Sequence, residues 1–223
     1  MAIDFDLLNY LKTFLTESRQ ERFKTILNKR TRHLTVAIEN VYLSHNASAV
    51  LRSCEVFGIQ DVHVIEKDYA FKTSTQITKG ANKWLTISKY NDYKNNTLAC
   101  IDMLRKKGYQ IVATTPHTDS CMLQDFDVSK KSVFFFGVEK EGLSDDVLQN
   151  ADVTLKIPMY GFSESLNISV AAAIILQHCT HKMKSQIIDW QLSQEEKDIL
   201  ELEWTKKTIK DVNQIIAHYR DNK

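Results

Sequence analysis

The segment 160-YGFSESLNISVAAAIILQHC-179 places several polar side chains directly before a long apolar run. If that run forms a buried helix, Ser165 or Asn167 can act as the N-cap by accepting hydrogen bonds from its first N–H groups. The string 161-GFSES-165 lacks the final glycine of the G-x-S-x-G nucleophile elbow, and nothing pairs His117 with a serine as its base, which disfavours a serine hydrolase. Capping accounts for only one or two of these polar residues, so a ligand-binding role stays open.

Three further polar residues stand at positions where chemistry is expected. Asn46 and Arg52 fall within an otherwise apolar helical stretch that ends at Gly58. Arg52 is either a surface residue or a fork-shaped ligand for a phosphate group. Glu139 directly follows the apolar strand 133-VFFFGV-138, so its carboxylate either pairs with a cation, for which Arg52 is a candidate, or acts on a ligand.

The elements around these residues alternate between strand and helix. β-branched and aromatic runs predict strands at 34–41, 61–66, 84–88, 109–115, 132–138 and 153–159. Helical periodicity predicts helices at 4–28, 46–58, 94–107, from about Ser144, 168–179, 193–203 and 205–220. This order predicts an α/β fold with a parallel sheet and helices on both of its faces.

In such a sheet, ligands bind at the C-terminal ends of the strands. The segments 113-ATTPH-117, 137-GVEKEGLS-144 and 157-IPMYGFSESLN-167 occupy these positions. None of them matches the glycine-rich phosphate cradles G-x-x-x-x-G-K-[ST] or G-x-G-x-x-G. The three loops are therefore the predicted ligand site, with a chemistry other than that of a P-loop or a dinucleotide fold.

We expect a core at 34–183 with helical extensions at 1–33 and 184–223. The net charge is only +1, so composition alone does not indicate a nucleic-acid-binding protein. The segment 18–33 is the most basic part of the chain, with six Lys or Arg residues against the single acid Glu21. It is either a solvated helix face or an arm that binds phosphates.

Composition restricts the remaining possibilities. The chain has 223 residues, 43% hydrophobic and 26% charged, as in a soluble globular protein. Its cysteines form no C-x-x-C pair and the N-terminus is not signal-like, so we expect reduced thiols and a cytoplasmic protein: Cys54, Cys100, Cys121 and Cys179. His178 and His181 have no third ligand nearby, so no metal site is expected. The apolar run 168–176 is too short to cross a bilayer.

Three motifs together resemble those of the SPOUT-superfamily RNA 2′-O-ribose methyltransferases, in particular the TrmH-type tRNA guanosine-2′-O-methyltransferases. They are 46-NASAVLRSCEVFG-58, 135-FFGVEKEGLSDD-146 and 157-IPMYGFSESLNISVAAAI-174. The likeness extends through 33-HLTVAIENV-41 and 79-KGANKWL-85 and covers about residues 20–185. No single motif is specific, but the combination is.

The resemblance implies a fold whose C-terminal part is tied in a deep trefoil knot. It also implies a homodimer and S-adenosylmethionine (AdoMet) as the cofactor. By position in the motifs, the residues of the cofactor pocket are Thr115, Phe136, Gly137, Val138, Glu139, Lys140, Ile157, Met159 and Leu166. Such a pocket consists mostly of backbone and apolar contacts, which suit an adenine ring and a sulfonium arm.

The reaction that the resemblance implies is methyl transfer to a ribose 2′-OH. By the same carry-over, the catalytic residues are Arg52, Asn46, Glu139, Ser165 and Asn167, all of which match the motifs. Arginine has a pKa above about 12 and is a reluctant base, so orienting the substrate phosphate is an equally good role for Arg52. The segment 162-FSE-164 varies in the family, and we expect it to contribute little specificity.

The short helical extensions favour tRNA as the substrate, and guanosine 18 of its D-loop as the target, because ribosomal-RNA members commonly carry a separate N-terminal domain. With this substrate, the basic segment is interpreted as a phosphate-binding arm, and its expected RNA contacts are Arg19, Arg22, Arg30 and Arg32. The alternatives are a ribosomal-RNA 2′-O-methyltransferase and an idle RNA-binding protein with the same fold. The five intact motif residues argue against the idle protein.

Overall fold

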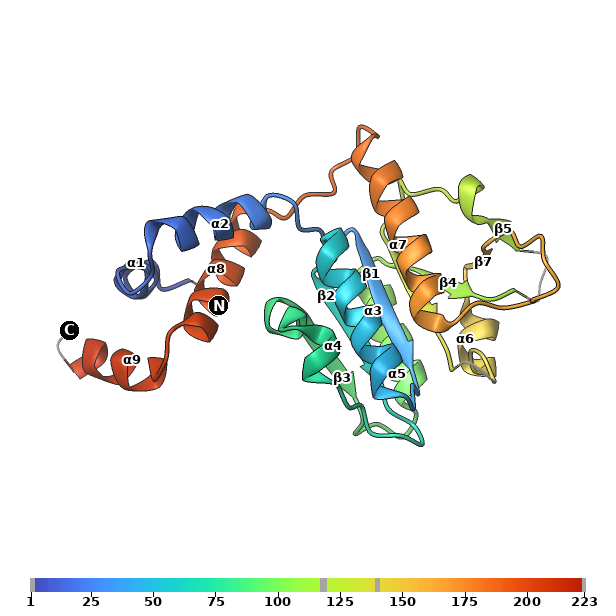
Figure 1. Ribbon diagram of the computed structural model, residues 1–223, viewed down its shortest axis with the longest axis horizontal. Helices are drawn as coiled ribbons and strands as arrows, with labels where there is room; N and C mark the ends of the chain where they lie inside the picture. Colours follow the sequence, from blue (N-terminus) through green and yellow to red (C-terminus); the bar gives the residue numbers. More distant parts are fainter. Residues whose placement is uncertain (1–2, 117–119, 139–140, 222–223) are drawn as a thin grey trace. The chain divides into compact units, whose positions relative to one another are not determined.

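The described residues form a seven-stranded sheet in which all strand pairings are parallel (Figure 1). The computed structural model describes residues 3–116, 120–138 and 141–221. In sheet order the strands are β3 (Thr86–Tyr90), β2 (Asp61–Ile65), β1 (Leu34–Glu39), β6 (Ser132–Phe136), β4 (Gln110–Thr114), β7 (Val153–Lys156) and β5 (Cys121–Met122).

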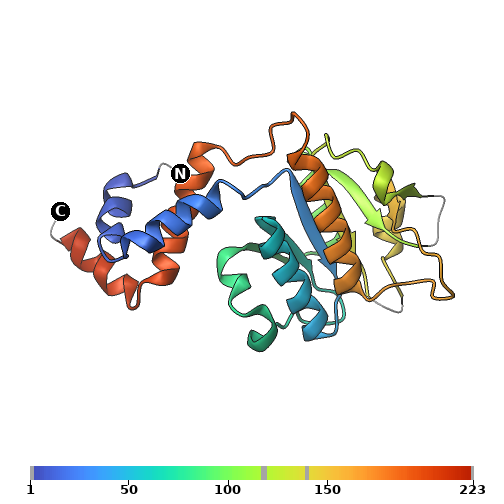
Figure 2. The same cartoon turned by 45° about the horizontal axis from the view of Figure 1, so that its top comes forward.

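Helices cover both faces of the sheet, as predicted. The helices α3 (Ser44–Phe57) and α7 (Ile168–Lys184) pack side by side on one face (Figures 1 and 2). The helices α5 (Asn96–Lys106) and α6 (Asp145–Asn150) lie on the other. Alternation along β6 serves both layers, because Phe134 and Phe136 join the core under α3 and α7 while Val133 and Phe135 join the core under α5 and α6.

The N-caps of two helices mark where the site loops end. Helix α3 ends at Gly58, whose φ of 85° is left-handed, as expected for a glycine stop. Ser144 caps α6 by accepting a hydrogen bond from the Val147 N–H, and Asn167 caps α7 by accepting one from the Ser169 N–H. Each of these two polar caps therefore stands at the end of a loop that follows a strand.

Several predicted bounds are wrong. The helix predicted at 4–28 is two helices, α1 (Phe5–Lys12) and α2 (Glu17–Leu27), because Thr16 starts a new helix by capping α2. The strand predicted at 84–88 begins two residues later, after a 3₁₀ turn, η1 (Ala81–Trp84). The helix predicted at 205–220 is instead the end of α8 (Gln194–Thr208) followed by α9 (Val212–Asp221). The two-residue strand β5 and the short turns α4 (Thr75–Thr78) and η2 (Leu123–Asp125) were not predicted.

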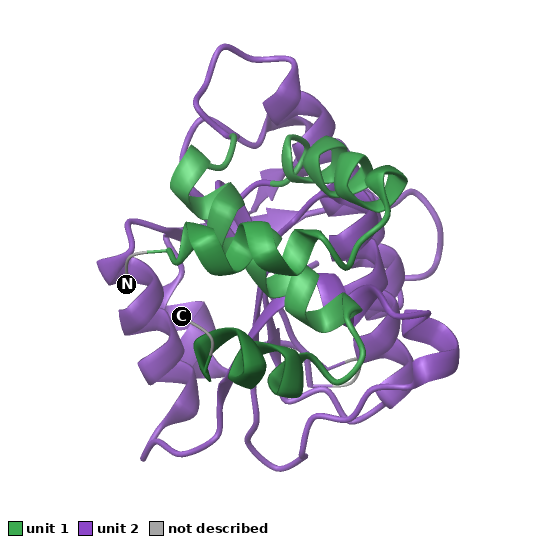
Figure 3. Ribbon diagram, turned by 90° about the vertical axis from the view of Figure 1, so that its left-hand side faces the viewer, with its two compact units in different colours: residues 1–30, 191–223 green, residues 31–190 purple. Residues whose placement is uncertain are grey.

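The chain forms two compact units, residues 1–30 with 191–223 and residues 31–190 (Figure 3). In the first unit, α1 and α2 pack against α8, with Phe23 against Trp204 at 5.6 Å between ring centroids. These bounds differ by a few residues from the expected 1–33, 34–183 and 184–223. The reason lies in Thr31, which belongs to the sheet unit because its N–H donates to Gly58 O (2.9 Å) and its hydroxyl to Trp190 O (2.6 Å).

Candidate active site

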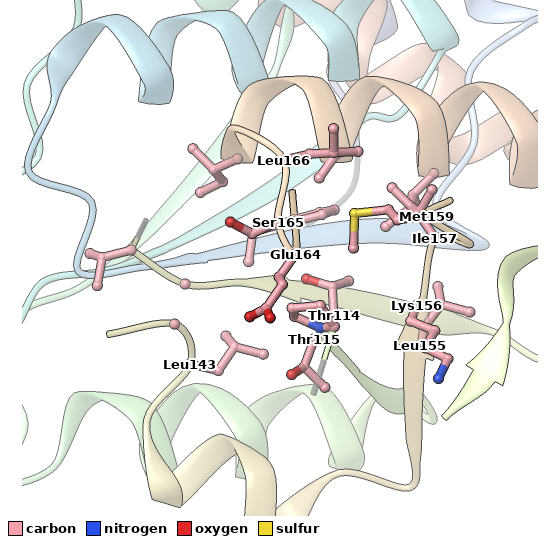
Figure 4. Close-up of a pocket in the computed structure, with 18 of the residues that line it drawn as sticks. Thr114, Thr115, Leu143, Leu155, Lys156, Ile157, Met159, Glu164, Ser165 and Leu166 are labelled. Carbon is pink, nitrogen blue, oxygen red and sulfur yellow. The ribbon is translucent and has the colours of Figure 1, made fainter. Parts of the chain in front are cut away.

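A cavity of about 270 Å³ opens at the C-terminal ends of β4, β6 and β7 (Figure 4). Its floor includes Thr114, Thr115 and Leu155, from the ends of β4 and β7. One wall comes from the loop after β6 and the other from the loop after β7. This is the edge of the sheet where the sequence predicted a ligand site.

The loop after β6 is held tightly against itself. Val138 N–H donates to Gly142 O (3.1 Å), and Gly142 N–H donates to Val138 O (2.9 Å). A Cβ atom on Gly137 would lie 2.0 Å from Gly142 O, so only glycine fits there. Phe136, Gly137 and Val138, which were expected to bind the cofactor, line the cavity, and Leu143 completes this wall.

The loop after β7 supplies the opposite wall. Ile157, Met159 and Leu166, which were expected to bind the cofactor, line the cavity, and so does Ser165, which was expected to be catalytic (Figure 4). The sequence analysis expected the segment 162–164 to contribute little specificity and did not place Glu164 in the site, yet its carboxylate projects into the cavity (Figure 4). The signal was available, since Glu164 is the only acid between Ile157 and Leu166 in a loop that was already expected to bind a ligand.

Two predicted catalytic residues meet directly. The Asn167 Nδ2 donates to Asn46 Oδ1 at 3.2 Å, although the two residues are 121 positions apart. The Oδ1 of Asn167 accepts from the Ser169 N–H (2.9 Å) and hydroxyl (2.6 Å). Asn167 therefore caps α7 with its oxygen and binds the start of α3 with its nitrogen.

Arg52 lies on the exposed side of α3, almost two turns beyond Asn46. Among the described residues, no carboxylate forms an ion pair with its guanidinium. Arg52 is also not one of the described residues that line the cavity. Glu139 and Lys140 lie outside the described residues, as does His117, so the possible pairing of Glu139 with Arg52 stays a prediction.

The four arginines expected to contact RNA occupy different environments. Arg19 and Arg22 are exposed on α2. Arg30 is buried, with its guanidinium carbon 5.4 Å from the centre of the Trp204 ring. Arg32 forms an ion pair with Asp61, with its Nε at 3.1 Å from both carboxylate oxygens. Exposure thus favours Arg19 and Arg22 as RNA contacts, while Arg30 and Arg32 serve packing and ion pairing.

Two of the buried thiols are poorly suited to nucleophilic chemistry. Burial raises the pKa of Cys100 and that of Cys179 to about 12, so both stay protonated at neutral pH. Across residues 3–116, 120–138 and 141–221, no three His, Cys, Asp or Glu side chains gather as a metal site would require. Within the same ranges, no helix has the length and apolar character needed to cross a membrane.

The comparisons with known proteins agree with this geometry. Residues 33–177 match the family described as SpoU rRNA Methylase. A protein of Borreliella burgdorferi named tRNA (guanosine(18)-2′-O)-methyltransferase is 38% identical over 203 residues, which is 91% of each chain. Its namesake from Thermus thermophilus is 35% identical over 161 residues, covering 72% of this chain and 81% of its own.

Solved structures show the same fold. The crystal structure of the A. aeolicus TrmH/SpoU tRNA modifying enzyme aligns with a TM-score of 0.76 and 31% identity, covering 87% of this chain and 98% of that one. The SpoU methyltransferase AviRb from Streptomyces viridochromogenes, in complex with the cofactor AdoMet, aligns with a TM-score of 0.61 over 72% of this chain and 64% of its own. At 24% identity this second likeness shows the fold alone. The family match covers more than half of the chain and confirms the predicted resemblance: this chain belongs to the SpoU rRNA Methylase family.

Proposed function

We propose that this protein transfers a methyl group from AdoMet to the ribose 2′-OH of a tRNA guanosine, most specifically guanosine 18. The observation that carries the proposal is the cavity at the strand ends, which is walled by the second and third motifs. Asn167 of the third motif contacts Asn46 of the first, so all three motifs meet at this end of the sheet. The relative from Borreliella burgdorferi, similar over 91% of both chains, supports tRNA rather than ribosomal RNA as the substrate.

The residues of the cavity fit AdoMet. Leu155, Ile157 and Leu166 offer apolar surfaces for an adenine ring. Gly137 and Gly142, whose backbones approach closely, line the cavity without side chains of their own, so their peptide groups can meet the ligand. Glu164 adds a carboxylate suited to the positive charges of the cofactor.

When bound, the cofactor supplies an electrophilic methyl group on a positively charged sulfur. The protein must then place a ribose 2′-OH in line with the bond between the methyl group and the sulfur. It must also make the proton of this hydroxyl easier to remove. We assign Arg52 the task of binding the adjacent phosphate through its two-pronged guanidinium. The phosphate can then accept or polarise the 2′-OH proton, which avoids using arginine as a base. Asn46, Asn167 and Ser165 would position the ribose, and Glu139 would complete the site.

The same proposal includes a homodimer, and the exposed faces of α3 and α7 support it. Val170 and Ile174 on α7 are 45% and 38% exposed, and Val56 on α3 is 64% exposed. These exposed apolar side chains lie on two helices that pack together, and the proposal is that a second copy buries them. Ile174→Glu should convert the dimer to a monomer in analytical ultracentrifugation, and an unchanged mass would contradict this interface.

The trefoil knot and the cytoplasmic location also remain parts of the proposal. β7 lies between β4 and β5, and the loop after it leads to α7, which packs against α3 from much earlier in the chain. This return of the C-terminal segment is compatible with a knot, which requires in addition that the segment pass through a loop of the chain. The four free cysteines, three of them buried, fit a reducing compartment.

The test is to map the methylated nucleotide after incubating unmodified tRNA or ribosomal-RNA fragments with labelled AdoMet. The proposal expects label on the ribose of guanosine 18 and at least about 100-fold slower transfer by Arg52→Ala, with unchanged cofactor affinity. The control is Arg105→Ala, which removes an exposed arginine from a different helix, α5. This variant should keep the normal rate of methyl transfer. Label on ribosomal RNA alone would favour a ribosomal-RNA 2′-O-methyltransferase. Binding of AdoMet without methyl transfer to any RNA would refute the proposal that the protein is an enzyme.

A further inference from the structure

A buried carboxylate outside the predicted site holds one wall of the cavity. Glu39 is the last residue of β1 and only 3% exposed. Its Oε2 accepts a hydrogen bond from the Ser144 N–H (2.9 Å), and its Oε1 accepts from the Ser144 hydroxyl (2.7 Å). Oε1 also accepts from the Thr97 hydroxyl on α5 (2.7 Å). An acid this deeply buried needs such partners, and these three donors supply them.

The partner of Glu39 is the residue where the cavity wall ends. Ser144 follows Leu143, which lines the cavity, and caps α6. At its other end the loop leaves β6 at Phe136 and is crossed by the hydrogen bonds between Val138 and Gly142. The two ends of this loop are therefore joined by backbone hydrogen bonds between Val138 and Gly142. Beyond them, Ser144 is hydrogen-bonded to Glu39 of β1.

Glu39 itself does not line this cavity among the described residues. Any effect on a ligand must therefore pass through Ser144 and Leu143. Glu39 accepts one hydrogen bond from the backbone of Ser144 and one from its side chain. Together these two bonds fix the position and the orientation of Ser144 relative to β1. β1 belongs to the same hydrogen-bonded sheet as β4 and β7, so its contact with Ser144 sets where Leu143 lies relative to Thr114 and Leu155 on the cavity floor.

We propose that Glu39 is a positioning residue that holds Gly142 and Leu143, at the end of the loop after β6, in their cofactor-binding position through Ser144. This inference rests on the proposed function for the identity of the ligand, AdoMet. The loop itself exists without that ligand, so its order can be measured on the cofactor-free protein.

The experiment compares Glu39→Ala, Glu39→Gln and Thr97→Val. Thr97→Val is the matched control, because it removes a hydrogen bond from the same buried carboxylate but leaves both bonds to Ser144. Glu39→Gln can still accept from the Ser144 N–H with its amide oxygen and donate to the two hydroxyl oxygens. AdoMet affinity is measured by calorimetry, folding by thermal unfolding, and loop order by amide hydrogen exchange at Gly142 and Ser144 without cofactor.

We expect Glu39→Ala to raise the dissociation constant of AdoMet at least about tenfold and to speed exchange of the two loop amides by a similar factor. Thr97→Val should lower the melting temperature, yet keep the affinity and loop exchange within about twofold. Glu39→Gln should stay within about threefold of wild type in affinity, which keeps the test decisive if Glu39→Ala fails to fold.

Three results would overturn the inference. One is unchanged exchange at Gly142 and Ser144 in folded Glu39→Ala. Another is a loss of affinity in Thr97→Val equal to that in Glu39→Ala, which would make Glu39 only a stabiliser of the fold. The third is a Glu39→Gln protein as impaired as Glu39→Ala. If wild-type protein binds no AdoMet, the proposed function fails, while the exchange data still decide the role of Glu39 in holding the loop.

Discussion

Substituting Gly137 with alanine tests whether the tight loop after β6 forms the cofactor wall. The added Cβ would stand 2.0 Å from Gly142 O, 2.3 Å from Gly142 C and 2.5 Å from Leu143 N. Contacts under 3.0 Å are not tolerated, so the Gly142 carbonyl must retreat by about 1 Å. All three atoms belong to the backbone, so no side-chain rotation relieves the clash.

The retreat would lengthen the two hydrogen bonds between Val138 and Gly142 from 3.1 and 2.9 Å to about 4 Å, which breaks them. At about 1 kcal/mol each, their loss lowers the free energy of unfolding by about 2 kcal/mol. A shift of about 1 Å also moves Leu143 against the ligand, so we expect the dissociation constant of AdoMet to rise at least about tenfold.

Gly161→Ala is the matched control in the opposite loop, because no atom lies within 4 Å of its added Cβ. It should leave the affinity within about twofold and raise stability by at most about 1 kcal/mol. Calorimetric titration and urea denaturation of both variants make the comparison. Normal affinity in a folded Gly137→Ala protein would refute the assignment of this loop as the cofactor wall.

Three further predictions concern other parts of the molecule. Asn167→Asp should keep the cap of α7 but removes the N–H donor to Asn46. We therefore expect kcat to fall while the melting temperature stays unchanged. Equal losses in kcat and in melting temperature would show that Asn167 acts only as a cap. Neutralising Arg19 and Arg22 together should weaken tRNA binding and reduce the salt dependence of log Kd; an unchanged slope would leave them a solvated face. Burial, with Lys107 as a lesser cause, lowers the pKa of His63 from 6.5 to about 4. The unfolded state therefore binds the extra proton between about pH 6.5 and pH 4, and stability should fall by up to about 3 kcal/mol as the pH drops through that window. Urea denaturation of wild type and His63→Gln at several pH values checks this, because the variant should lose most of the slope.

The sheet and its ligand edge could be predicted from the sequence because apolar runs and glycine stops are local signals. Gly58 marks the end of α3, and the aromatic and β-branched run 133-VFFFGV-138 favours a buried strand. The two-residue strand β5 gives no periodicity to detect. The split of the first predicted helix follows from the cap at Thr16, which competed with a continuous apolar spacing across 4–28.

The roles of charged residues were harder to predict, because the sequence alone does not show whether a charged side chain is buried or exposed. Arg30 and Arg22 belong to one basic segment, yet Arg30 lies against Trp204 while Arg22 is exposed. In the sequence, Glu39 looks like an ordinary polar residue at the end of a strand. Its hydrogen bond with Ser144, which is 105 residues away, could not be predicted from the residues around it. Contacts at this separation are set by the packing of the sheet and its helices, which local patterns do not encode.

The polar start of α7 shows why capping and chemistry need not be alternatives. A planar amide presents an acceptor and a donor on opposite edges, and Asn167 uses both at once. Its Oδ1 holds the first turn of α7, which fixes the side chain in one orientation. That orientation aims Nδ2 at Asn46 at the start of α3, so the cap determines the geometry of the contact between the first and third motifs. Serine or aspartate would cap as well but could not donate an N–H across this distance, and for that reason we infer that the position requires asparagine.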